Sequence, residues 1–148
     1  MDKSSAFPAN FTLHVHQEIE IEAPAQVVFD TILDQAGPGF TAMDGKSMQL
    51  RLEPWPGGRW FRDLGNNTGH FWGHVQVIKP PTVLEIIGPM FMSYAVAGHL
   101  QYRLVEKAGI TTLSLAHHAI GEISQQHRDN VTKGWSQFLE KLKNRAQR

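Results

Sequence analysis

The hydrophobic and polar positions of this chain follow two different periods. Between Thr12 and Ala119 they alternate in short runs that Gly and Pro interrupt. From Ser124 to Arg148 there is no Pro, and the apolar residues recur every three or four positions. Alternation is typical of half-buried strands, and the longer spacing is typical of an amphipathic helix. The pattern predicts an α+β fold in which a curved antiparallel sheet wraps around one long C-terminal helix.

Turn-forming residues divide the alternating region into separate strands. We expect strands over residues 13–21, 48–52, 59–64, 70–78, 83–87, 98–106 and 111–119. Pro24 suits the first position of a short helix, which Gly37 and Pro38 would end, and Ser124 provides an N-cap for the final helix. Residues 1–10 are small and polar and predict a loose lead-in. The length of 148 residues and the lack of a linker predict a single domain over residues 1–148.

The last two strands have clear buried sides. Leu113 and Leu115 mark the inner side of one strand, and the period of two carries His117 to that side with them. In the preceding strand, Tyr102 faces inward together with its apolar neighbours two residues away. We therefore expect both polar rings in the interior.

Alternation is less clear in the two middle strands. In the strand over 70–78, the more apolar side holds Phe71, Gly73, Val75 and Val77, so we expect His70, Trp72 and His74 on the outer side. In the strand over 59–64, placing Trp60 inside brings Arg62 inside as well. A buried Arg requires a partner, and we expect functional chemistry at this conflict. Two alternatives remain open: Arg62 forms a surface pair with Asp63, or it reaches a ligand carboxylate or an inner acid.

The final helix presents one apolar stripe, formed by Val131, Trp135, Phe138 and Leu142. Gly134 lies on the same side, where it either admits another backbone or leaves space beside the helix. His127 lies one turn before Val131 and is expected near the mouth of any such space.

Composition excludes several classes of function. Fourteen basic residues balance fourteen acidic ones, which excludes the basic footprint of a nucleic-acid-binding protein. Cys is absent, the N-terminal residues lack the apolar run of a signal peptide, and no apolar run approaches the ~20 residues of a membrane-spanning helix. We expect a cytoplasmic protein without membrane insertion. The pairs His14–His16 and His70–His74 are expected to face solvent without nearby carboxylates, so we expect neither a metal nor a cofactor.

Several short motifs resemble a known family in order and spacing. They are Ala23-Pro24 with Val28-Phe29, Pro56-Gly57-Gly58-Arg59-Trp60, Gly73-His74-Val75, Pro80-Pro81 with Leu84, Thr111-Thr112-Leu113-Ser114-Leu115, and Gly134-Trp135 with Leu139 and Leu142. Over about residues 13–145 the chain resembles the START-like or SRPBCC superfamily, and within it the branch homologous to the C-terminal domain of the heat-shock chaperone ATPase activator. The resemblance implies a helix-grip fold with an apolar ligand cavity. The chain departs from the family at Arg62 and Asp63, where apolar or aromatic residues are common.

These observations leave three functions open. The first is binding of a small, largely apolar molecule between the final helix and the sheet, in a cavity lined by Trp60, Arg62, Tyr102, His117, Val131 and Trp135, with Phe91 and Met92 at its rim. The second is a cavity enzyme of cyclase or hydrolase type, in which His117 carries a proton and Arg62 holds an anion. The third is a co-chaperone-like interaction module whose outer surface carries Trp72, which also favours a homodimer. The sequence shows no nucleophile–base–orienter set, so binding is the favoured hypothesis.

Overall fold

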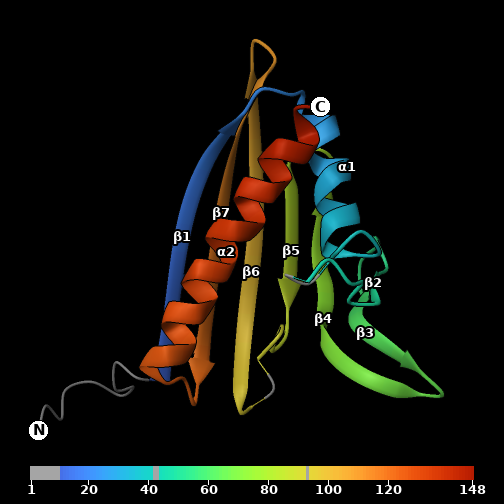
Figure 1. Ribbon diagram of the computed structural model, residues 1–148. Coiled ribbons are helices and arrows are strands. Elements are labelled where there is room, and N and C mark those ends of the chain that lie inside the picture. Colours follow the sequence, from blue (N-terminus) through green and yellow to red (C-terminus); the bar gives the residue numbers. More distant parts are fainter. Residues whose placement is uncertain (1–10, 42–43, 93) are drawn as a thin grey trace, which may run out of the picture.

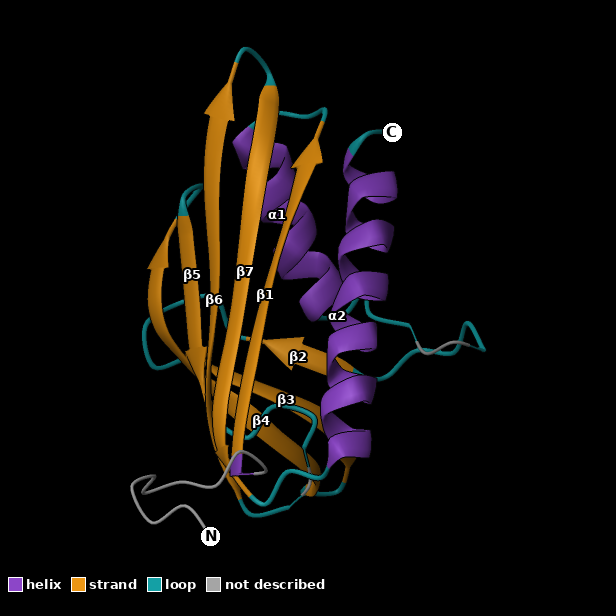
Figure 2. Cartoon of the chain, turned by 90° about the vertical axis from the view of Figure 1, so that its left-hand side faces the viewer, coloured by secondary structure: helices purple, strands orange, loops and turns teal. Residues whose placement is uncertain are grey.

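The computed structural model describes residues 11–41, 44–92 and 94–148, so the lead-in expected over residues 1–10 lies outside the described residues. Within them, a seven-stranded sheet of order β1-β7-β6-β5-β4-β3-β2 packs against two helices on one of its sides (Figure 1 and Figure 2). The elements are β1 (Thr12–Ile21), α1 (Ala25–Ala36), β2 (Leu50–Leu52), β3 (Arg59–Gly65), β4 (Thr68–Lys79), β5 (Val83–Ile87), β6 (Val96–Lys107), β7 (Ile110–Gly121) and α2 (Gln125–Ala146). This arrangement confirms the predicted α+β helix-grip fold.

The sheet is antiparallel throughout, and its order follows the chain except for β1. Strands β2 to β7 are consecutive neighbours, whereas β1 returns to the far edge and pairs with β7. In Figure 1, α2 crosses the side of the sheet formed by β1, β7 and β6, and α1 lies beside its C-terminal end. Figure 1 shows that α2 runs along most of the length of β1, β7 and β6, that α1 lies at the upper end of the sheet, and that the β3–β4 hairpin curves away from α2 at the lower end.

Both helices begin within one residue of the predicted start. Pro24 has an extended backbone just before α1, with φ −62° and ψ 151°, and Gly37 follows its last residue. The hydroxyl of Ser124 accepts a hydrogen bond from the backbone N–H of His127 at 3.1 Å, which caps the start of α2. Along α2 the buried positions include Val131 and Trp135, as expected of the apolar stripe.

The predicted faces of β4 were wrong around Trp72 because the strand contains a bulge. Trp60 of β3 pairs with Gly73, but the next residue, Phe61, pairs with Phe71, so Trp72 is an extra residue in the ladder. Such an insertion reverses which side chains face inward beyond it. Trp72 is consequently buried, with 6% of its surface exposed, whereas Phe71 is turned out and is 48% exposed.

Neither of the helices in the described part of the chain combines the length and the apolar character that crossing a bilayer would require.

Candidate functional site: an aromatic cavity under α2

A cavity of about 620 Å³ lies between α2 and the β3–β4 hairpin. This volume is within the range of about 300–1,000 Å³ that is typical of small-molecule sites. The expected residues Trp60, Arg62, Phe91, Met92, Val131 and Trp135 all line it. The space predicted between the final helix and the sheet is therefore present.

A continuous row of aromatic rings forms much of the cavity wall. The ring centroids of Trp60 and Trp72 are 5.0 Å apart, those of Trp72 and Phe91 are 5.8 Å apart, and Phe91 lies 5.7 Å from Trp135. Phe138 continues the row at 5.5 Å from Trp135. Successive rings meet edge to face, an arrangement that aromatic quadrupoles favour. The rings come from β3, β4, the loop after β5 and α2, so the site depends on the complete fold.

The inner rings are held in place by hydrogen bonds. The Trp60 indole N–H donates to the carbonyl oxygen of Ala36 at 2.6 Å, which joins β3 to the end of α1. The Trp135 indole N–H donates to Nδ1 of His117 at 2.9 Å, which joins α2 to β7. A buried indole N–H needs such a partner, and the fixed rings give the cavity a defined wall.

The helix leaves the cavity open at Gly134. Gly134 is exposed, and a Cβ placed on it would meet no atom within 4 Å, so no other backbone packs closely against the helix at this residue. The neighbouring wall residues Val131 and Trp135 are buried. Of the two explanations considered for this glycine, the structure therefore supports the one in which it provides volume.

The polar groups of the cavity are few, and those that can carry charge are basic. Arg62 and His70 are direct partners across the β3–β4 ladder and both line the cavity. His127 lines it from α2, where its ring stacks on Tyr94 with centroids 4.4 Å apart. Arg62 Nε and His127 Nδ1 are shielded from solvent and have no hydrogen-bond partner among the described residues. Burial raises the pKa of Tyr94 above its ordinary value.

Two expected site residues lie behind the wall instead of lining it. His117 is completely buried under Trp135, and this burial, with smaller contributions from the charges of His118 and His99, lowers its pKa to about 4. Tyr102 packs against the same indole at 6.3 Å between ring centroids, and its burial raises its pKa. Both rings face inward as predicted, but the indole of Trp135 separates them from the space.

Other lining residues were not predicted. They are Phe40, Met48, His70, Trp72, Tyr94 and Asn130. Phe40 belongs to the irregular connection between α1 and β2, where the sequence has no periodicity to assign a side. Met48 was expected to begin the strand over 48–52, but β2 begins only at Leu50, so Met48 lies in that connection. His70 and Trp72 were assigned to the outer side because a strict period of two takes no account of the bulge. A large indole beside a Gly in β4 was the available signal, since glycine inside a strand often marks a bulge.

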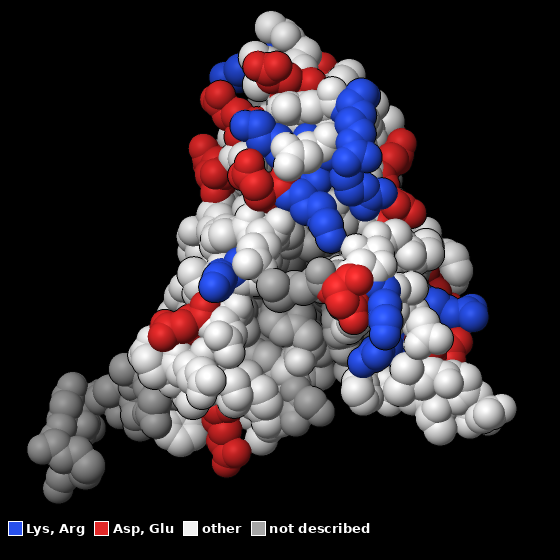
Figure 3. All heavy atoms as spheres, in the orientation of Figure 1, with Lys and Arg blue, Asp and Glu red and all other residues white. Residues whose placement is uncertain are grey.

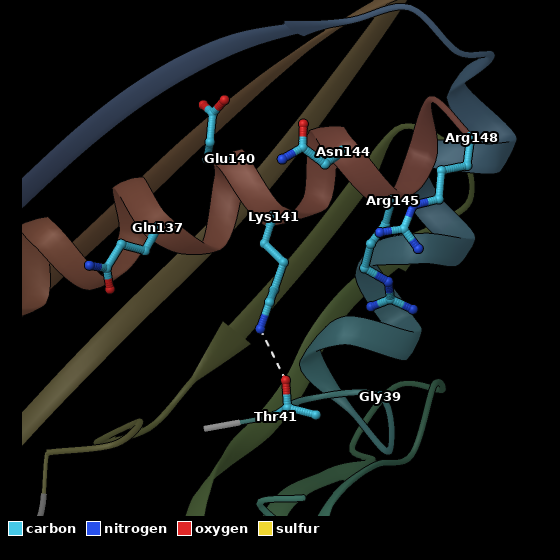
Figure 4. A pocket seen from close by; sticks show the side chains of 8 residues that line it. All are labelled: Gly39, Thr41, Gln137, Glu140, Lys141, Asn144, Arg145 and Arg148. Carbon is cyan, nitrogen blue, oxygen red and sulfur yellow. Dashed lines mark hydrogen bonds between the residues drawn. The ribbon is translucent and has the colours of Figure 1, made fainter. Parts of the chain in front are cut away.

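A second hollow lies beside the C-terminal half of α2, and its polar residues hold the helices together. Its volume is about 640 Å³, and Figure 3 shows Lys and Arg side chains gathered over this end of the molecule. Lys141 donates to the Thr41 hydroxyl at 3.0 Å (Figure 4), and Arg145 contacts Asp34 and Gln35. These contacts fasten α2 to α1 and to the connection that follows it.

The remaining histidines lie mainly on the outer side of the sheet. His16 and His118 approach to 2.8 Å between their Nε2 atoms, and His14 lies opposite His118 in the β1–β7 ladder. Burial, followed by the charges of neighbouring histidines, lowers the pKa of His118. Within the described ranges, no three His, Asp or Glu side chains are arranged so that they could hold a metal ion.

The fold is similar to several solved structures of low sequence identity. Protein CV1439 from Chromobacterium violaceum matches with a TM-score of 0.68 at 15% identity, over 91% of this chain and 97% of that one. The Aha1 dimer from Colwellia psychrerythraea matches with a TM-score of 0.60 at 14% identity, over 91% and 96%. Ara h 8.0201 matches with a TM-score of 0.64 at 9% identity, over 91% and 97%. These likenesses show a shared fold.

No match was found among curated proteins. The family model described as "Activator of Hsp90 ATPase homolog 1-like protein" matches residues 22–147, which span α1, all strands from β2 to β7, and α2. The same span contains every lining residue of the aromatic cavity. On this evidence of sequence and fold together, the chain belongs to the family of Activator of Hsp90 ATPase homolog 1-like proteins, within the SRPBCC or START-like fold group.

Proposed function

We propose that this protein binds a small, largely apolar molecule in the cavity between α2 and the β3–β4 hairpin. The volume of about 620 Å³ suits a molecule of two or three fused or linked rings. The row of indole and phenyl rings provides an apolar wall, and removing a ligand's apolar surface from water contributes roughly 25 cal/mol per Å² before the costs of association.

Gly134 is the observation that supports this proposal most directly. Gly134 is exposed and lines the cavity, and a Cβ added there would meet no atom within 4 Å, so the cavity is open along this part of α2. Gly inside a helix costs about 1 kcal/mol relative to Ala. A glycine in this exposed part of the lining is consistent with an opening through which a ligand reaches the aromatic rings.

The two alternative functions have less support. His117 lies behind Trp135 and its lowered pKa keeps it neutral near pH 7, so it is poorly placed to exchange a proton with a molecule in the cavity. The interaction module depended on an outward Trp72, and that ring is part of the cavity wall.

The test is to fill the cavity from α2. Gly134→Leu should weaken binding of the neutral fluorescent probe N-phenyl-1-naphthylamine at least ~10-fold, because the new side chain occupies the probe's volume. The matched control is Lys133→Leu, which adds the same side chain one residue away at an exposed position. Fluorescence titration measures both dissociation constants. Equal affinity in the wild type and both variants would exclude this cavity as the binding site.

We also propose a homodimer, in keeping with the dimer described for the Colwellia psychrerythraea relative. Phe71 and Ile87 are 48% and 42% exposed on the outer side of the sheet, and each lies next to His74. Sedimentation velocity of the wild type and of Phe71→Glu tests this surface. A monomer in both cases at high micromolar concentration would contradict the dimer.

A further inference from the structure

We propose that the apolar ligand carries a carboxylate and that Arg62 binds it. The inference rests on the proposed function, since it names the chemical class of the molecule that the aromatic cavity takes. It arises from an arginine that lines the cavity, is partly buried, and has no acidic partner among the described residues.

The neighbouring arginines are paired, and Arg62 is not. Arg51 forms an ion pair with Asp63 at 3.1 Å, and Arg59 forms one with Glu53 at 2.8 Å. In the described part of the chain, Arg62 takes part in no ion pair, and its Nε atom is shielded from solvent without a hydrogen bond. An unpaired donor in such a place costs free energy, so a ligand that satisfies it would gain affinity.

The strand geometry explains why Asp63 does not pair with Arg62. Adjacent strand residues point to opposite sides of a sheet, so Arg62 shares the cavity side with Trp60, and Asp63 shares the outer side with Phe61. On that outer side Asp63 pairs with Arg51 of β2. The fold thus directs the nearest carboxylate away from the cavity and leaves the guanidinium inside it.

The rest of the cavity favours a single negative charge. No Asp or Glu is present among its described lining residues, whereas His70 lies directly across the ladder from Arg62 and His127 lines the opposite wall. A planar guanidinium matches a carboxylate through two parallel hydrogen bonds. A phosphate monoester would bring a second charge, and Arg62 is the one permanently charged side chain among those lining residues.

The aromatic rings complete the description of the ligand. Trp60 and Trp72 stand beside Arg62 on the sheet, and the row continues through Phe91 to α2. A flat apolar body would pack against these rings while its acid group meets the guanidinium. The class of ligand is therefore an aromatic or polycyclic carboxylic acid.

Isothermal titration calorimetry with two matched compounds tests this inference. Naphthalene-2-acetate and naphthalene-2-acetamide have nearly the same size, and only the first is charged at pH 7.5. We expect the wild type to bind the acetate at least ~10-fold more tightly, which corresponds to about 1.4 kcal/mol. Arg62→Gln should remove this preference and leave the acetamide affinity within about twofold, because the amide does not need the charge.

Arg51→Gln is the matched control, since it removes an arginine from the adjacent strand that pairs on the outer side. It should leave both affinities unchanged. Arg62→Lys, which keeps the charge but not the planar fork, should bind the acetate with intermediate affinity and provides the test if Arg62→Gln fails to fold.

Equal affinity of the wild type for the acetate and the acetamide, or a preference that survives Arg62→Gln, would overturn the carboxylate inference. If the acetamide still binds and Gly134→Leu abolishes that binding, the proposed function stands without it. If neither naphthalene compound binds, the carboxylate inference is overturned, and the naphthylamine titration decides the proposed function separately.

Discussion

His117 shows how one buried residue can make the stability of the whole protein depend on pH. Its pKa is about 4 in the folded protein, mainly because burial opposes the charged form, whereas an unfolded chain restores the ordinary value of 6.5. Between these values the unfolded state binds the proton more readily. The neutral ring therefore contributes its full stability above pH ~6.5, and this contribution is lost as the pH falls towards 4.

We expect the free energy of unfolding to fall by on the order of 3 kcal/mol between pH 7 and pH 4 from this residue alone. Urea titrations across that range measure it. In His117→Gln the amide oxygen can still accept the Trp135 N–H, but the side chain does not titrate, so most of the fall should disappear. His70→Gln, at an exposed position, should keep the wild-type profile. An unchanged profile in His117→Gln would show that this ring is not the source.

For several residues, the sequence predicts which side of the strand the side chain faces but not which residue it contacts. The alternation that puts His117 on the same side as Leu113 and Leu115 correctly placed it inside, and the alternation in β3 correctly placed Trp60 and Arg62 on one side, where both line the cavity. The alternation of side chains along a strand cannot show that Trp135 would cover His117. That contact joins residues on different elements, and its geometry depends on how α2 crosses the sheet.

At the scale of single elements, α2 depends on its first turn. Ser124 provides the capping oxygen, and it is the last of the three residues that connect β7 to α2. We expect Ser124→Ala to lower the free energy of unfolding by about 1 kcal/mol, because an N–H at the start of the helix loses its partner. Chemical denaturation measures the change. Ser124→Asp keeps a capping oxygen and should remain near wild type; equal losses in both variants would rule out the cap as the cause.

The strands and helices were predictable because their periods differ, while the bulge in β4 was not. Once one residue of a strand is assigned to a side of the sheet, the period of two assigns all the others. A single inserted residue reverses the assignment of the residues beyond it. Because of the insertion at Trp72, the sequence analysis assigned Trp72 and His70 to the outer side, although both line the cavity. The side-chain orientations in the connection from α1 to β2 were not predictable for a different reason, because an irregular segment has no periodic pattern from which they follow.

For the molecule as a whole, the two periods were enough to predict a helix held by a curved sheet. The volume of the cavity was not predictable, because it is the small space that remains after all side chains have packed. Gly134 was a visible indication of that space, but the sequence equally allowed a close helix contact there. Only the positions of the surrounding elements distinguish the two.

Ligand binding should be visible in the stability of the entire fold. A probe that binds only the folded protein at 100 times its dissociation constant stabilises it by about 2.7 kcal/mol. For a chain of this length we expect N-phenyl-1-naphthylamine at that excess to raise the unfolding midpoint by about 4 °C or more. Thermal unfolding followed by circular dichroism measures the shift. Gly134→Leu should show almost none at the same probe concentration, and an equal shift in that variant would point to binding elsewhere.

The placement of the indoles gives the protein an optical property of its own. Of its four tryptophans, Trp60, Trp72 and Trp135 surround the cavity, and Trp55 is 55% exposed on a turn outside it. In a Trp55→Phe background, tryptophan emission would therefore come entirely from the indoles that line the cavity. Quenching or a spectral shift of that emission would report occupancy without any attached label, even for a guest that absorbs no visible light.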